Sequence, residues 1–122
     1  MNVKEFYEAV DGDYEEMKRK FLSDARIRRF ALMFLRDGSM EDLRAGMRDG
    51  DYEKAFLAAH TLKGVCLNLG FSGLLAPVSE ITELLRSVAN AEAAGLMPVA
   101  EQVYAATVEG LRELERSEAI PR

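Results

Sequence analysis

Apolar residues recur every three or four positions along most of this chain, and no segment shows a sustained apolar/polar alternation bounded by hairpin turn residues. Spacings of three and four place side chains on one face of an α-helix, whereas a half-buried strand needs a period of two. The sequence therefore predicts an all-α fold. Its 122 residues suffice for one domain with a single core and are too few for two.

Two short amphipathic helices are predicted at the N-terminus, over residues 3–10 and 13–22. A glycine stops the first helix, and Asp13 can cap the second. We expect residues 1–22 to be peripheral and to cover one end or side of the fold that residues 23–118 build.

Residues 23–118 are predicted to form an antiparallel four-helix bundle, because amphipathic helices joined by short loops pack most simply in this way. Capping residues, glycines and prolines give the expected helix boundaries. The expected helices run over residues 23–37, 51–68, 72–90 and 98–118, with a short helix over residues 39–49.

Serines and prolines decide several of these boundaries. Ser39, with an aspartate three residues later, resembles a capping box, and Ser72 is a possible cap. Pro77 would remove a backbone hydrogen bond from a helix begun at Ser72, so we expect a kink or a later start. Residues 90–95 are expected to be a connection, because Pro98 suits the first position of a helix. The closing helix is expected to bury a stripe of small and apolar residues: Val99, Val103, Ala106, Gly110 and Leu114.

The charge balance restricts the classes of partner. Sixteen basic and 21 acidic residues give a formal charge of −5, which argues against nonspecific nucleic-acid binding. The basic cluster between Lys18 and Arg29 is interpreted as a solvated helix face.

Acidic residues interrupt the N-terminus, and no segment is apolar enough for a signal peptide or a membrane span. We expect a stand-alone monomer in the reducing cytoplasm.

The chain has one cysteine, Cys66, and one histidine, His60. A single cysteine excludes an intrachain disulfide and a thiolate metal cluster. A metal or haem bundle would have only one imidazole ligand, and no residues are available for a Cys-His type of catalytic centre. No metal site is therefore predicted, and any chemistry is expected to centre on one residue.

A helical wheel places His60 opposite the buried face of its helix. The arc from about 140° to 240° away from the histidine is entirely apolar, which indicates that it faces the core. This arc consists of Ala55, Ala58, Leu62, Val65, Cys66 and Leu69. His60 is thus expected to be exposed, with Lys63 and Gly64 on the next turn and with Phe56 and Leu67 within about 40° of it.

This combination suits a phosphorylated histidine. An exposed neutral imidazole is a competent nucleophile near neutral pH. A phosphoryl group on it would carry up to about two negative charges, and Lys63 can supply the neighbouring cation. Gly64 costs roughly 1 kcal/mol relative to alanine inside a helix, which suggests that a second active site must approach closely there.

The residues Ala59-His60-Thr61-Leu62-Lys63-Gly64, followed by Asn68-Leu69-Gly70, resemble the signature of histidine-containing phosphotransfer (HPt) domains of two-component phosphorelays. The resemblance implies a four-helix bundle whose histidine accepts phosphate from a receiver-domain aspartate and passes it to another receiver. It makes His60 the phosphoacceptor, Lys63 the phosphate neighbour and Gly64 the access residue. It also implies a carrier without its own kinase, nucleotide site or cofactor, because the partner receiver supplies magnesium and the acidic residues.

The resemblance also gives the apolar residues near His60 a role. Phe56 and Leu67, with Leu57 as a further candidate, would form a patch that docks on a receiver. The alternative is that an N-terminal helix covers them. Many family members carry Leu-Glu where this chain has Ile81-Thr82, and this departure, like Pro77, bears on helix packing more than on phosphotransfer.

A second hypothesis is a helical adaptor that binds a receiver or another signalling protein without carrying phosphate. Such an adaptor would keep its binding after loss of His60. The presence of both Lys63 and Gly64 beside the histidine favours the phosphorelay carrier, because a purely structural helix needs neither residue there.

Overall fold

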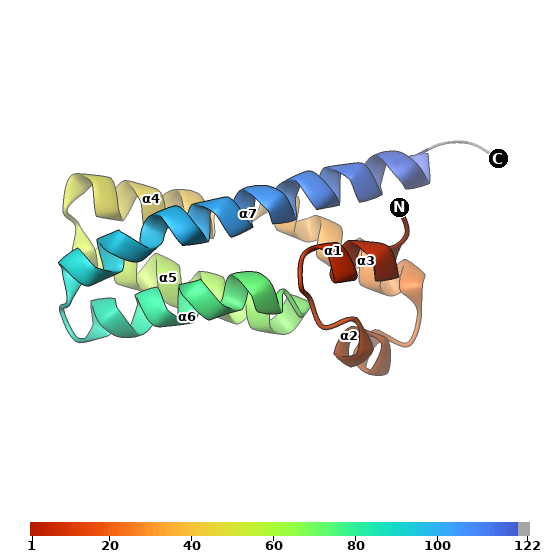
Figure 1. Cartoon of the computed structure of the whole chain (residues 1–122), viewed down its shortest axis with the longest axis horizontal. Coiled ribbons are helices and arrows are strands. Elements are labelled where there is room, and N and C mark those ends of the chain that lie inside the picture. The colour runs from red at the N-terminus through yellow and green to blue at the C-terminus, as the bar shows by residue number, and fades with distance from the viewer. Residues whose placement is uncertain (120–122) are drawn as a thin grey trace.

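A computed structural model describes residues 1–119, and this part of the chain contains helices and no strands. The all-α prediction is confirmed. The elements, in chain order, are α1 (Val3–Ala9), α2 (Tyr14–Phe21), α3 (Asp24–Leu32), the 3₁₀ turn η1 (Met33–Arg36), α4 (Ser39–Asp49), α5 (Tyr52–Leu69), α6 (Ser72–Arg86) and α7 (Asn90–Ala119) (Figure 1).

Four helices, α4 to α7, form the bundle, and each packs against the next one in the chain (Figure 1). A bidentate ion pair closes the remaining side between α4 and α7. Arg44 Nε lies 2.7 Å from one carboxylate oxygen of Glu101, and its Nη2 lies 2.7 Å from the other. The Arg44 guanidinium also lies 5.1 Å from the centre of the Tyr104 ring, which fixes its orientation further.

The N-terminal helices α1 to α3 lie together at one end of the bundle (Figure 1). They contribute to the core as well as covering it, because Phe6 and Tyr7 are fully buried and pack edge-on or tilted against Phe71. The Tyr7 hydroxyl donates a 2.6 Å hydrogen bond to the carbonyl of Leu69. The Asp13 amide donates to the carbonyl of Gly70. The end of α5 is therefore held by the N-terminal segment.

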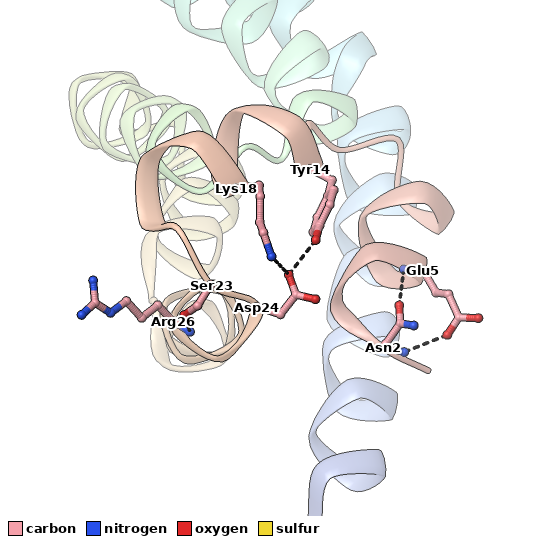
Figure 2. Close-up of polar contacts among 7 residues, drawn as sticks. All are labelled: Asn2, Glu5, Tyr14, Lys18, Ser23, Asp24 and Arg26. Atoms are coloured by element: carbon pink, nitrogen blue, oxygen red, sulfur yellow. Dashed lines mark hydrogen bonds and ion pairs between the residues drawn. The ribbon is translucent and has the colours of Figure 1, made fainter.

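Asp24 joins α2 to α3 (Figure 2). One of its carboxylate oxygens accepts hydrogen bonds from the Tyr14 hydroxyl at 2.6 Å and the Lys18 ammonium at 3.2 Å. These two donors, Tyr14 first, hold the pKa of the Asp24 carboxyl below its usual range. Figure 2 also shows the capping box of α1, in which Asn2 and Glu5 exchange hydrogen bonds.

Two predicted serine caps are wrong. Ser39 and Ser72 are each the first residue of their helix, and neither side chain caps it. Other groups satisfy the free amides: the Asp37 carboxylate accepts from the Ser39 amide at 2.9 Å, and the Asp11 carbonyl accepts from the Gly73 amide at 3.0 Å. The Asp11 carbonyl belongs to the N-terminal segment, so the sequence around Ser72 could not predict this contact.

Pro77 and Pro98 both lie inside helices, which corrects two predictions. Helix α6 begins at Ser72 and continues through Pro77, so the later start is wrong. Helix α7 begins at Asn90, so the connection at residues 90–95 and the start at Pro98 are wrong. Alanine is the best helix former, and the fully buried Ala93 anchors this alanine-rich first part of α7. This packing offsets the one backbone bond that a proline removes.

Helix α6 also ends earlier than expected, at Arg86, because Val88 has a φ of +62° that no helix can continue through. The buried stripe of α7 differs too, since Ala106 is exposed and Val99 is 50% exposed. Its fully or almost fully buried residues are Ala93, Ala100, Thr107, Gly110, Leu111 and Leu114, so Gly110 and Leu114 are buried as predicted. Thr107 is buried without penalty because its hydroxyl donates to the Val103 carbonyl of its own helix.

Candidate functional site

His60 lies in the middle of α5 and is exposed, as the wheel predicts. The opposite face of the helix is the buried one, and it comprises Ala55, Ala58, Ala59, Leu62 and Cys66. Asp51 caps the helix by accepting a hydrogen bond from the Lys54 amide, and Gly70 ends it with a φ of +71°. Packing on both neighbours and defined ends therefore hold His60 on a rigid support, directed toward solvent.

Phe56 lies against the imidazole on the preceding turn. The two rings are stacked, with centroids 6.1 Å apart and planes 23° from parallel. Arg86 of α6 places its guanidinium 4.9 Å from the centre of the Phe56 ring. Phe56 is half-buried in this position and links the orientation of His60 to the neighbouring helix.

Lys63 lies one turn after His60 and extends toward α6. Its ammonium is 3.8 Å from a carboxylate oxygen of Glu83, and the other oxygen of Glu83 lies 3.2 Å from Arg86 Nε. Two cations and one carboxylate thus line the α6 side of the histidine. The Lys63 side chain is 35% exposed, so it can also reach a charge at the surface.

Gly64 has open space where a side chain would be. A Cβ atom built on it would meet nothing within 4 Å, whereas a Cβ on Gly46 would lie 2.7 Å from the Ala55 amide nitrogen. A Cβ on Gly110 would lie 3.0 Å from the Phe6 ring. Internal packing therefore explains Gly46 and Gly110 but not Gly64. The bare backbone at Gly64 leaves the histidine accessible from that side.

The two leucines near the histidine face solvent, Leu57 being 58% and Leu67 62% exposed. The N-terminal helices do not bury them, although α2 comes close enough for Lys20 to donate to the Asn68 carbonyl. The Arg86 side chain of α6 covers part of the Phe56 ring.

Sequence reasoning did not single out Glu83 and Arg86. Their spacing of three residues on one helix is a signal for an ion pair, and the pair is present. That this pair faces Lys63 depends on how α6 packs on α5, which local patterns do not give. The family departure at Ile81-Thr82 is accommodated in the core, where both side chains are fully buried and the Thr82 hydroxyl donates to the Val78 carbonyl.

Cys66 is buried as predicted, and burial raises the pKa of its thiol to about 12, so it is not a second nucleophile. Among residues 1–119 there is no group of three or more His, Cys, Asp or Glu side chains that could hold a metal ion. No helix in the described part of the chain has the length and apolar character needed to cross a membrane.

Comparison with known proteins gives one match. The family model described as Hpt domain matches residues 16–117, a segment that includes all of α3 to α6 and the histidine motif. Searches of curated proteins and of solved structures each gave no significant match. Because the matched segment covers most of the sequence, the chain belongs to the Hpt domain family, whose members are phosphocarrier modules of two-component signalling.

Proposed function

We propose that this protein is a phosphorelay carrier in which His60 accepts a phosphoryl group from the aspartate of a receiver domain and passes it to another receiver. One observation carries the proposal: the single imidazole of the chain is exposed opposite the core, between the Lys63 cation and the open backbone of Gly64. No nucleotide takes part, since the donor is already phosphorylated.

The transfer is a displacement at phosphorus. A ring nitrogen of His60 forms a bond to the phosphorus as the bond to the aspartyl oxygen breaks, and the aspartate leaves as a carboxylate. The onward transfer reverses these steps on the second receiver. In this proposal magnesium and the acidic groups belong to the receiver, and Lys63 neutralises part of the phosphoryl charge on the carrier.

Gly64, Phe56 and Leu67 would serve the approach of the receiver. The absence of a side chain at Gly64 permits the donor and acceptor atoms to come into line. The exposed Leu67 and the half-buried Phe56 provide apolar surface on either side of the histidine. A transient interface of this kind buries less than about 1,200 Å² in total.

The test is incubation of the protein with a phosphorylated receiver domain, followed by detection of an acid-labile, alkali-stable label. Wild-type protein should take up the label and His60→Gln should not. Because His60 is exposed, the variant should keep the helical content and thermal midpoint of the wild type, which separates loss of the nucleophile from loss of the fold. Label on His60→Gln would refute the proposal, whereas an unlabelled wild type that binds the receiver equally well with and without His60 would support the adaptor.

A further inference from the structure

A carboxylate from α6 reaches the cation that stands beside His60. Glu83 lies 3.8 Å from the Lys63 ammonium with one oxygen and 3.2 Å from Arg86 Nε with the other. Arg86 in turn lies over Phe56, which stacks on the histidine. Before any phosphoryl group arrives, Glu83 therefore already offsets part of the positive charge of Lys63 and Arg86 on this side of the site.

We propose that Glu83 is a positioning residue that competes with the phosphoryl group on His60 for Lys63, and so keeps the phosphohistidine easy to discharge. The inference rests on the proposed function and goes beyond it by assigning a role to a residue outside the histidine motif. In the unphosphorylated protein the Lys63 ammonium pairs with the Glu83 carboxylate, and after transfer it also pairs with the phosphoryl group.

The charges give the direction of the effect. A phosphoryl group adds up to about two negative charges next to Lys63, and the Glu83 carboxylate already occupies the same ammonium. Like charges that share one cation repel each other, so Glu83 raises the free energy of the phosphorylated state. Replacing Glu83 by glutamine removes this repulsion and leaves the whole charge of Lys63 and Arg86 for the phosphoryl group.

The size of the effect follows from exposure. The side chains of Lys63 and Glu83 are 35% and 56% exposed, so water and salt screen their interaction. We expect Glu83→Gln to raise the equilibrium ratio of phosphohistidine to phosphoaspartate about two- to fivefold. The increase should shrink as the salt concentration rises, because screening weakens the repulsion.

The experiment measures that equilibrium ratio for the full chain mixed with one phosphorylated receiver domain. The ratio between the free proteins does not depend on how tightly they dock, so a contact between Glu83 and the receiver would change the rate and not this ratio. Glu80→Gln is the matched control, because Glu80 is exposed on the same helix and forms no ion pair in the described part of the chain. It should leave the ratio unchanged.

A double variant tests whether Glu83 acts through the lysine. In a Lys63→Met background, Glu83→Gln should change the ratio much less than in the wild type, because the shared cation is gone. A Glu83→Gln ratio equal to or below that of the wild type, or equal to that of Glu80→Gln, overturns the inference while the proposed function stands. A wild type that takes no label from the receiver overturns the proposed function itself.

Discussion

The imidazole of His60 and the ring of Phe56 are stacked, with 6.1 Å between their centroids and 23° between their planes. An exposed side chain on a helix would otherwise sample several rotamers. The stack restricts this freedom, and Arg86 over the same phenylalanine ring ties the arrangement to α6. The orientation of the nucleophile is therefore set by a neighbouring turn and a neighbouring helix together.

Phe56→Leu should slow phosphoryl transfer to His60. Leucine keeps apolar bulk but removes the ring, and an aromatic pair is worth about 0.5–1.5 kcal/mol, or about a two- to tenfold change in rate. Single-turnover transfer from a phosphorylated receiver measures the rate. Phe21→Leu is the matched control, because Phe21 is also half-buried, stacked on another ring and close to a cation. Equal rates for the two variants would contradict the role of the stack.

Gly64→Gln should slow transfer by about tenfold or more, because the added side chain fills the open space through which the receiver approaches. Gly95→Gln provides the comparison, since a Cβ on Gly95 also meets nothing within 4 Å. Both changes should leave helicity equal or higher, as glutamine is a better helix former than glycine. Transfer rates and circular dichroism of the two variants check these expectations. A Gly64→Gln variant that transfers phosphate at the wild-type rate would contradict the access role of Gly64.

Gly46→Ala should destabilise the protein by about 1–3 kcal/mol despite the better helix propensity of alanine. The new methyl group would lie 2.7 Å from the Ala55 amide nitrogen, so α4 and α5 would have to separate. Urea unfolding measures the loss. Gly95→Ala, which meets no neighbour, should instead be neutral or stabilising, and a similar gain for Gly46→Ala would show that the helices are not in close contact.

Tyr7→Phe should cost about 1 kcal/mol at neutral pH, because the Leu69 carbonyl loses its 2.6 Å partner. Burial raises the pKa of the Tyr7 hydroxyl above its unfolded value of about 10. The stabilisation from the protonated form is complete below that pH and is lost as the pH rises above it.

Above about pH 10, wild-type stability should thus fall more steeply than that of Tyr7→Phe, as measured by urea unfolding at each pH. Part of the fall should remain in the variant, because the pKa of Cys66 is also raised. Tyr52→Phe, at an exposed position, is the control and should follow the wild type. Identical pH profiles for wild type and Tyr7→Phe would rule out the assigned role.

The histidine face was predictable because it depends on one helix alone. The periodicity of α5 places His60 opposite Leu62 and Cys66, and no other element is needed to see this. Glu83 was not predictable as part of the site, because its distance from Lys63 depends on the packing of α6 against α5. Contacts between helices are set by the whole core, and local patterns carry little of that information.

The wrong boundaries have a common cause as well. Pro98 and Val88 each have a strong local preference, the first for a helix start and the second against a positive φ. In the structure α7 continues through Pro98 and Val88 turns the chain at φ +62°, because tertiary packing outweighs these preferences. The boundaries at Asp13, Gly50 and Gly70 were right because capping and tertiary packing agree there.

The position of α1 bears on how this domain can be divided. Phe6 and Tyr7 are fully buried beside Phe71, yet they precede residues 16–117, the segment that matches the family. A fragment cut at the edge of the match would begin inside α2 and would turn one face of Phe71 toward water. In this protein the segment that matches the family model is shorter than the segment that builds the hydrophobic core.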